Sequence, residues 1–194
     1  MKRGVEMPHN VESSPQHKVE IYNSEELPWD TIKEDILGVE LSAFGEEEAF
    51  GEDMLERDFR DTDSVIVLMR DVKLDRIVGF TYAKPVTKTY PEDFPERVPS
   101  KDTAYVYDTA LEKEYQGKGL VGSLLAKLDE ELVRRGFSFV ERDSANYAEG
   151  GEKETYADKI RRNYKDRIVY EESHDSEYGP QVFFRIRLVT QTQK

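Results

Sequence analysis

Three glycines and a lysine stand close together in the middle of the chain, in the segment Gln116-Gly117-Lys118-Gly119-Leu120-Val121-Gly122. The segment follows an apolar stretch of strand length and precedes a stretch with helical periodicity. Glycines let the backbone approach an anion closely, and the first N–H groups of a helix have no partners within that helix. With the helix dipole behind them, such amides bind phosphate groups. This turn therefore predicts a pyrophosphate site, to which Lys118 adds a positive charge.

Two other phosphate-binding motifs fit this turn less well. The loop of nucleoside triphosphatases has four residues between its glycines and ends in Gly-Lys-Ser or Gly-Lys-Thr, which this turn lacks. Gly117, Gly119 and Gly122 do have the spacing of the dinucleotide-binding fingerprint. That fingerprint also needs an acid at the end of a strand about 20 residues on, where only Glu141 and Asp143 stand, and a long antiparallel region precedes the turn. A dinucleotide site stays open as a minor alternative.

The periodicity of the flanking sequence predicts the elements that position this turn. Strands are expected over residues 18–22, 64–69, 76–84, 104–109, 137–142, 167–172 and 181–189, and helices over about 32–44, 52–60, 119–136 and 154–165. Prolines between Pro85 and Lys101 predict a long loop, either a functional flap or a surface insertion. Residues 174–180 are expected to connect the last two strands. Hairpins together with one strand–helix–strand crossover predict an α/β fold, a single mixed, mostly antiparallel central sheet with helices on both faces.

Composition limits the classes of function. The chain has 194 residues with 28 Lys and Arg against 41 Asp and Glu, so its net charge is −13. This length suits one domain, expected over 17–190 after a flexible leader at 1–16. The acidic balance disfavours nucleic-acid binding. Without cysteine there is no disulfide and no thiol catalysis, and the three scattered histidines predict no metal site. No apolar run of about 20 residues and no signal peptide are present, which predicts a cytoplasmic protein without membrane contact.

The segment from Tyr107 to Gly119 resembles the acetyl-CoA-binding motif of the GNAT superfamily of N-acetyltransferases. The family pattern is Gln/Arg-x-x-Gly-x-Gly/Ala after a strand that splays away from its neighbour. Gln116 and Gly119 match it, whereas Val121 stands where the family prefers Gly or Ala. The order of elements is also similar, which predicts a GNAT-like fold and acetyl-CoA as co-substrate. By this resemblance the cofactor is held by Thr109, Ala110 and Leu111 at the acetyl and pantetheine arm and by Gln116, Gly117, Lys118, Gly119, Leu120, Val121 and Gly122 at the pyrophosphate.

Two residues near the last helix are implied by the same resemblance. The segment from Asn163 to Val169 resembles the family's Tyr-x-x-x-Gly-Phe signature, although it contains no Gly-Phe pair. The resemblance implies that Tyr164 returns a proton to the leaving thiolate. Tyr164 could instead only pack beside Ile160, and Tyr156 is a weaker substitute for its role. Asn146 follows a strand at the place where family members often carry an asparagine that orients substrate or cofactor.

An amine must lose a proton before it attacks a thioester, which calls for a carboxylate near the reacting atoms. Asp108, near the end of the splayed strand, is the candidate for this general base. Glu141 and Asp143 are weaker alternatives. The competing interpretation of Asp108 is a turn or capping residue.

The resemblance also places the acceptor groove between the loop at 46–50 and the last hairpin. Both segments are acidic and carry an aromatic residue, so Glu47, Phe50 and Tyr178 are expected to bind a cationic primary amine, of a polyamine, an aminoglycoside-like compound or a lysine. The acids could equally be a solubilising coat. We therefore predict an acetyl-CoA-dependent N-acetyltransferase with a small-molecule or peptide acceptor, and a homodimer stays open. The alternative is a non-catalytic acyl-CoA-binding sensor, which Val121 and the missing Gly-Phe pair favour.

Overall fold

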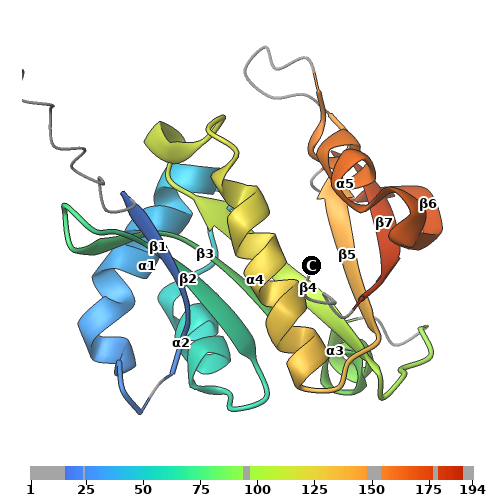
Figure 1. Ribbon diagram of the computed structural model, residues 1–194, viewed down its shortest axis with the longest axis horizontal. Helices are drawn as coiled ribbons and strands as arrows, with labels where there is room; N and C mark the ends of the chain where they lie inside the picture. Colours follow the sequence, from blue (N-terminus) through green and yellow to red (C-terminus); the bar gives the residue numbers. More distant parts are fainter. Residues whose placement is uncertain (1–15, 24, 94–96, 148–153, 177–178, 190–194) are drawn as a thin grey trace, which may run out of the picture.

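The computed structural model describes residues 16–23, 25–93, 97–147, 154–176 and 179–189 (Figure 1). In that part of the chain seven strands form one sheet in the order β1-β2-β3-β4-β5-β7-β6. The strands are β1 (His17–Ile21), β2 (Val65–Asp71), β3 (Arg76–Pro85), β4 (Thr103–Leu111), β5 (Phe139–Ala145), β6 (Ile168–Ser176) and β7 (Gly179–Arg187). The helices are α1 (Trp29–Phe44), α2 (Glu52–Arg60), α3 (Val86–Asp93), α4 (Leu120–Arg134) and α5 (Tyr156–Tyr164), with the short 3-10 helices η1 (Lys113–Tyr115) and η2 (Lys165–Arg167).

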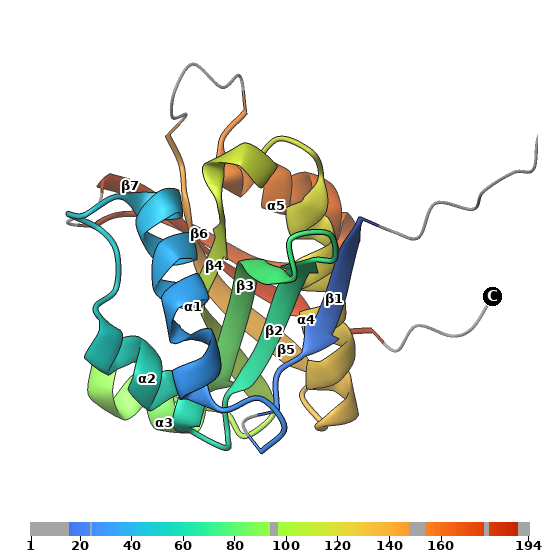
Figure 2. The ribbon, with the colours of Figure 1, turned by 90° about the vertical axis from the view of Figure 1, so that its left-hand side faces the viewer.

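Helices cover both faces of the sheet, as the sequence predicts (Figure 2). On one face Trp29 of α1 and Phe59 of α2 pack against Phe80 of β3 in an aromatic-rich core. On the other face Leu128 of α4 and Ile160 of α5 belong to a second core. Each helix buries one apolar stripe against the sheet, and this burial drives the layering. Only β4 and β5 pair in parallel, so the sheet is mixed and mostly antiparallel.

The segment after Pro85 is not the uninterrupted loop that its prolines predict. The helix α3 begins at Val86, directly after Pro85, where a proline outside the helix removes no helical hydrogen bond. Val86 and Tyr90 stand four residues apart and are buried with Tyr105 and Phe183 in a third small core. Burial of this apolar pair against the sheet outweighs the proline signal, and the prediction of a loop was wrong for these eight residues.

The connector predicted at 174–180 is also mostly strand. The strand β6 runs to Ser176, and β7 already begins at Gly179. The φ of Gly179 is +96°, in the left-handed region that glycine adopts readily, so the chain reverses within a few residues. Tyr178 lies outside the described residues, as do residues 1–15 of the predicted leader. None of the helices in the described ranges is long and apolar enough to cross a membrane.

The parallel strands β4 and β5 separate along their length. They are joined by three residue pairs, of which the last is Tyr105 with Glu141. Beyond this pair β4 continues to Leu111 and β5 to Ala145 without pairing with each other. Figure 1 shows the two strands diverging toward the N-terminus of α4. The predicted splayed strand is therefore present, and backbone groups on one edge of β4 have no neighbouring strand.

The strand β4 also carries a β-bulge at the place where it leaves β5. Tyr82 of β3 faces Asp108, but the next residue, Ala83, faces Val106, so Tyr107 is an extra residue in β4. A bulge bends its strand and changes the direction of the side chains that follow it. This bulge lies where β4 leaves β5, and Asp108 directly follows it.

Candidate active site

The glycine turn between η1 and α4 is built on two left-handed residues. Gly117 has a φ of +70° and Gly119 a φ of +77°. In this region a residue with a Cβ is less stable by about 1–2 kcal/mol, which explains the two glycines. The side chain of Gln116 donates a hydrogen bond from Nε2 to the carbonyl oxygen of Leu111 at 2.8 Å. This bond ties the turn to the end of β4, so the predicted motif residue Gln116 has a structural role in addition to the one implied for its amide.

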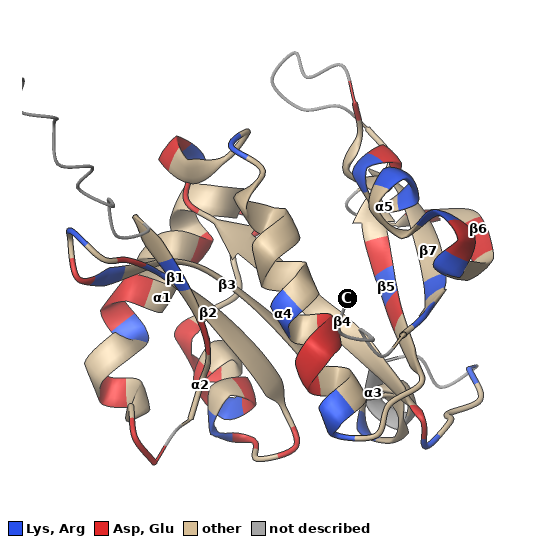
Figure 3. Ribbon diagram, in the orientation of Figure 1, with Lys and Arg blue, Asp and Glu red and all other residues tan. Residues whose placement is uncertain are grey.

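The amides of this turn are suited to an anion. Gly119 is the N-cap of α4 and offers no side chain to the first helical turn. Within the described part of the chain the amides of residues 117–119 donate no hydrogen bond. A Cβ added at Gly117, Gly119 or Gly122 would meet no atom within 4 Å, so open space adjoins the turn. Residues 120–126 carry no charge, as the uniform colour of this end of α4 shows (Figure 3), and Lys118 Nζ lies 5.3 Å from the Tyr115 ring centroid.

Asp108 lies directly after the bulge and beside Glu40 of α1, both buried, with exposed fractions of 8% and 1%. Asp108 Oδ1 accepts a hydrogen bond from the Thr109 amide at 2.6 Å, and Glu40 Oε1 accepts one from the Phe50 amide at 2.9 Å. The second oxygens, Asp108 Oδ2 and Glu40 Oε2, have no hydrogen-bond donor among the described residues, and the two carboxyl groups interact with each other. Burial and then the adjoining Glu40 raise the pKa of Asp108 well above its ordinary value, and burial raises the pKa of Glu40. Burial of two adjoining carboxyl groups favours a state in which the pair holds a single proton.

Tyrosines adjoin this pair of carboxyl groups on the same face of the sheet. The Tyr107 ring stacks on Tyr82 with centroids 5.7 Å apart and meets the Tyr105 ring edge-on at 5.5 Å. Lys84 Nζ lies 5.1 Å from the Tyr107 ring centroid and 2.9 Å from Asp58 Oδ1. The face thus already holds one ammonium group between a tyrosine ring and a carboxylate.

The loop between α1 and α2 is connected to this face through Phe50. Phe50 is half-buried, packs against the α1–α2 core and hydrogen-bonds to Glu40 through its amide. Glu47 is exposed on the turn before it. Of the two described residues predicted for the acceptor, Phe50 is linked to Asp108 through Glu40, and Glu47 has no such hydrogen bond to the pair.

On the opposite face of the sheet Tyr164 is buried beside Ile160, yet its hydroxyl group is not merely packed. It donates a hydrogen bond to Asp129 Oδ1 of α4 at 3.3 Å, and Asp129 Oδ2 accepts one from Arg167 Nη1 at 3.3 Å. Burial and then the charge of Asp129 raise the pKa of Tyr164. Burial also raises the pKa of Asp129 to about 6. Tyr164 thus connects α5 to α4 across the side where β4 and β5 diverge.

Arg142 lies next to this group and is the first β5 residue after the last pair with β4. Its side chain is almost fully buried, with 4% exposed. Arg142 Nη2 donates hydrogen bonds to Tyr156 Oη at 2.9 Å and to Thr109 Oγ1 at 3.4 Å. It thereby joins the weaker candidate Tyr156 to the strand on which the acetyl arm is expected.

The two alternative bases are engaged by other side chains. Glu141 accepts a hydrogen bond from Tyr90 of α3, and burial raises the pKa of Glu141 to about 7. Asp143 accepts a hydrogen bond from the Tyr105 hydroxyl at 2.7 Å, and His174 Nε2 lies 2.7 Å from its other oxygen. Asp108 Oδ2, by contrast, has no hydrogen-bond partner among the described residues, so Asp108 stays the candidate base.

The remaining predicted cofactor residues lie along the diverging strands. Residues 109–111 pair with β3 on one edge of β4, and their other edge has no strand partner. Asn146 follows β5, and its amide donates to the Pro180 carbonyl oxygen at 2.9 Å. Among the described residues no group of three His, Asp or Glu side chains could hold a metal ion.

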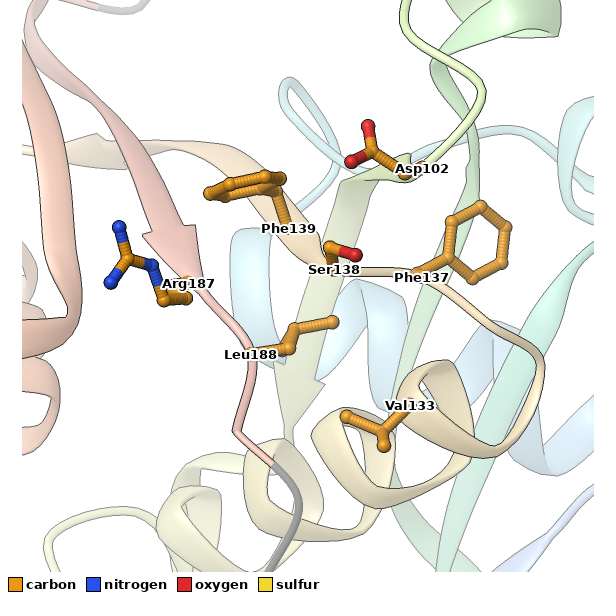
Figure 4. A pocket seen from close by; sticks show the side chains of 7 residues that line it. All are labelled: Asp102, Val133, Phe137, Ser138, Phe139, Arg187 and Leu188. Carbon is orange, nitrogen blue, oxygen red and sulfur yellow. The ribbon is translucent and has the colours of Figure 1, made fainter.

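A surface hollow lies at the opposite end of the sheet and does not belong to this site (Figure 4). It adjoins the C-terminal end of α4 and the start of β4, far along both elements from the glycine turn. Its lining residues are Asp102, Val133, Phe137, Ser138, Phe139, Arg187 and Leu188.

Sequence reasoning missed three residues of the candidate site, namely Glu40, Asp129 and Arg142. A signal was available for each of them. Glu40 continues the apolar stripe of α1, because it stands four residues after Ile36. Arg142 stands two residues after the buried Val140 and so lies on the same face of β5. A charged residue at an inward position of this kind indicates a buried polar partner or a function. Asp129 has the same signal, because it stands four residues after the buried Leu125 of α4.

Comparisons with known proteins agree with this geometry. A model of the acetyltransferase (GNAT) family matches residues 21–149. A comparison with curated proteins finds no match. Among solved structures, the ribosomal-protein-S18-alanine N-acetyltransferase of Escherichia coli is similar, with a TM-score of 0.58, 13% identity, and coverage of 92% of this chain and 97% of that chain.

Two further structures extend the comparison. An aminoglycoside 6′-acetyltransferase type Ii has a TM-score of 0.61 at 13% identity, and 90% of this chain and 99% of that chain are covered. A GNAT family acetyltransferase from Elizabethkingia anophelis, solved with acetyl-CoA bound, has a TM-score of 0.51 at 13% identity, with coverage of 90% and 100%. At such identities the structures show the shared fold, and the family match covers well over half of the residues. The chain belongs to the GNAT family of acetyltransferases, as its glycine turn and splayed strand predict.

Proposed function

We propose that this chain moves the acetyl group of acetyl-CoA directly to a primary amine, and that the amine is cationic in solution. The observation that carries the proposal is the buried pair Glu40 and Asp108, set at the bulge where β4 leaves β5. Two adjoining carboxyl groups disfavour each other's negative charge, which raises their pKa. Such a pair therefore takes up a proton more readily than an isolated carboxylate. Removing a proton from an attacking ammonium group is the task that this reaction requires.

The cofactor is proposed to lie across the mouth of the splay. The amides of residues 117–121 hold its pyrophosphate, helped by the N-terminus of α4 and by Lys118. The unpaired edge of β4 at 109–111 receives the pantetheine arm. When bound, the cofactor supplies an activated acetyl group as a thioester. No acyl-enzyme is expected, because the chain has no cysteine to carry it.

Three side chains are proposed to move protons. Asp108, with Glu40 sharing its negative charge, takes the proton of the amine. Tyr164 gives a proton to the leaving thiolate when its hydroxyl group rotates away from Asp129. Asp129 then restores that proton, for which a pKa of about 6 is suitable, since such a carboxyl group exchanges protons with water near neutral pH.

The cationic nature of the acceptor is inferred from the face on which Asp108 lies. Tyr107 and Tyr105 present rings beside the carboxyl pair, and this face already holds the ammonium group of Lys84 against the Tyr107 ring. Aromatic rings and carboxylates together attract an ammonium group and pack against its carbon stem. The S18-alanine and aminoglycoside acetyltransferases also act on amines, which is compatible with either a peptide or a small molecule as acceptor.

An acceptor panel tests this proposal. We would compare kcat/KM for a diamine, a lysine peptide and an aminoglycoside with kcat/KM for primary amines of similar length that carry a hydroxyl or a carboxylate at the far end. The proposal expects the cationic acceptors to be at least about tenfold better, and the preference to shrink at high salt because surface charge is screened. Equal turnover of all classes would overturn the assignment of a cationic acceptor, but not that of an acetyltransferase.

A second candidate function is a non-catalytic acyl-CoA-binding sensor. It is favoured by one observation, the hydrogen bond that commits the Tyr164 proton to Asp129. Calorimetric titration with acetyl-CoA, run beside the acceptor panel, separates the two. Binding without turnover of any amine would support the sensor, whereas turnover excludes it.

A further inference from the structure

Arg142 is a buried cation for which the described residues supply no ion-pair partner. Its side chain is 4% exposed, and its two hydrogen-bond acceptors are the neutral hydroxyl groups of Tyr156 and Thr109. Arg142 Nε is buried and donates to no acceptor among the residues that the structure describes. The guanidinium group lies 5.1 Å from the Tyr156 ring centroid.

Burying the charge of Arg142 without an ion-pair partner is unfavourable unless an anionic group binds beside it. Arginine keeps its charge at any pH at which proteins fold, so it does not escape burial by losing a proton. Taking an unpaired charge out of water lowers stability by several kcal/mol. Buried charges are therefore paired, bound to a ligand or retained for function. None of the described residues forms an ion pair with Arg142, and this points to a ligand or a reaction step.

The nearby carboxylates already have other partners. Asp129 accepts hydrogen bonds from Tyr164 and Arg167, and Asp108 from the Thr109 amide with Glu40 beside it. Both lie close enough for Arg142 to lower the pKa of each, though it is the smallest of the causes acting on each. The titratable and charged groups around Arg142 come from β4, α4, α5 and η2, and are Tyr105, Asp108, Asp129, Tyr156, Tyr164 and Arg167.

The position of Arg142 indicates which anion it meets. It stands at the apex of the splay, one residue beyond the last β4–β5 pair. Arg142 also donates a hydrogen bond to Thr109, which lies on the part of β4 that has no strand partner on the β5 side. A ligand arm lying along this edge places its reactive end, rather than its phosphates, at the apex. The phosphates belong to the glycine turn, at the far end of β4.

We infer that Arg142 is the cationic partner of the CoA sulfur in its thiolate form. This inference rests on the proposed function. In the transfer the amine nitrogen bonds to the acetyl carbon, the C–S bond breaks, and its electron pair goes to sulfur. The amine proton goes to the carboxyl pair on the other face of the sheet. Arg142 stabilises the negative sulfur until Tyr164 protonates it, so that the products are the amide and the thiol.

The test compares CoA with desulfo-CoA, in which a hydrogen replaces the thiol group, by calorimetric titration of the full chain between pH 7 and pH 9.5. The ratio of the two affinities cancels the phosphates and every protein group that does not sense the sulfur. Asp129 titrates below this range. An ordinary thiol has a pKa of about 8.5, and a neighbouring arginine lowers it. A thiol pKa lowered by one unit in the complex tightens CoA by about tenfold relative to desulfo-CoA as the pH rises through the window between the bound and free values.

Two variants assign the effect to Arg142. Arg142→Gln keeps a donor for the Tyr156 hydroxyl and removes the charge, so the pH-dependent gain should disappear while the affinity for desulfo-CoA is kept. Arg142→Lys retains a charge and should keep part of the gain. Arg70→Gln, at a partly exposed arginine of β2 that pairs with Glu20, makes the same change in net charge far from the splay and should behave as the wild type.

The outcomes separate this inference from the proposed function. If the wild type binds CoA and desulfo-CoA alike at every pH, or if Arg142→Gln keeps the pH-dependent gain, the inference is overturned and the acetyltransferase assignment is unaffected. If neither compound binds, the proposed cofactor site itself is wrong. Should Arg142→Gln fail to fold, the Arg142→Lys and Arg70→Gln proteins and the wild-type ratio still decide the question.

Discussion

Replacing Glu40 by glutamine should move the pH dependence of the reaction without abolishing it. The amide oxygen of glutamine still accepts the hydrogen bond from the Phe50 amide, so the loop between α1 and α2 keeps its attachment. What the change removes is the negative charge beside Asp108. Replacing Asp108 by asparagine removes the proposed base itself, for which a loss of about 10²–10⁴-fold in kcat/KM is expected.

The size of the pH shift follows from the repulsion between two neighbouring carboxylates. At a generic separation of about 4 Å, two unit charges interact by about 4 kcal/mol at an effective dielectric constant of about 20, which corresponds to about three pKa units. Because a pair that favours a single proton experiences only part of this repulsion at a given pH, a shift of about one to two units is expected. Glu40 raises the pKa of Asp108, and its removal lowers that pKa. The rising limb of kcat/KM against pH should therefore move to lower pH.

A second consequence does not depend on activity. Because the pKa of Asp108 is raised in the folded state, the folded chain binds more protons than the unfolded chain, and stability falls as the pH rises above the unfolded value of about 4. In Glu40→Gln this fall should be smaller. Thermal melts of both proteins at pH 5 and pH 8 measure the difference, in which the contributions of other groups cancel.

The assay is release of CoA thiol, followed at saturating acetyl-CoA from pH 5 to pH 10 with the best acceptor of the panel. Glu47→Gln, at an exposed acid on the same loop, is the matched control and should leave the profile unchanged. If Glu40→Gln keeps the wild-type pH profile, or if Asp108→Asn retains more than about a tenth of the activity, the carboxyl pair is not the base.

Two further predictions concern the glycine turn and Tyr164. Gly119→Ala places a Cβ at a φ of +77°, so we expect a melting temperature lower by about 2–8 °C and weaker CoA binding in calorimetry. Gly38→Ala, inside α1 with nothing within 4 Å, should instead stabilise by about 0.5–1 kcal/mol, and a common sign for both changes would contradict the reasoning. Tyr164→Phe should lower kcat by about 10–100-fold with CoA affinity nearly unchanged in titrations, and full activity would exclude Tyr164 as the acid.

The features of the site that the sequence predicts well are those set by local backbone requirements. The glycines at 117 and 119 are needed because the turn before α4 uses left-handed conformations, and such a need is visible in sequence order. The end of α4 shortly before Gly136, whose φ is +92°, is predictable for the same reason. Strand alternation and helical stripes then suffice for the central sheet, because one apolar face is buried in each element.

The features that the sequence does not predict depend on contacts between distant segments. The pairing of Glu40 with Asp108 joins residues from α1 and β4, and Tyr164 with Asp129 joins α5 to α4. Neither partner indicates the other until the helices are docked on the sheet. The helix α3 was missed for a related reason, since its apolar pair Val86 and Tyr90 is too short a signal to outweigh four nearby prolines without the surface that it covers.

The strand β4 separates two charged groups that would otherwise cancel each other. Asp108 faces α1 with Glu40, whereas Arg142 of β5 faces α5 with Tyr156. If both lay on one side they would form a buried ion pair, and neither would be available to a reacting amine or to its leaving group. In the proposed transfer a proton acceptor near nitrogen and a cation near sulfur act on opposite sides of the carbon between them. The bulge at Tyr107 makes this separation possible, because it turns Asp108 toward α1 at the point where the neighbouring strand diverges.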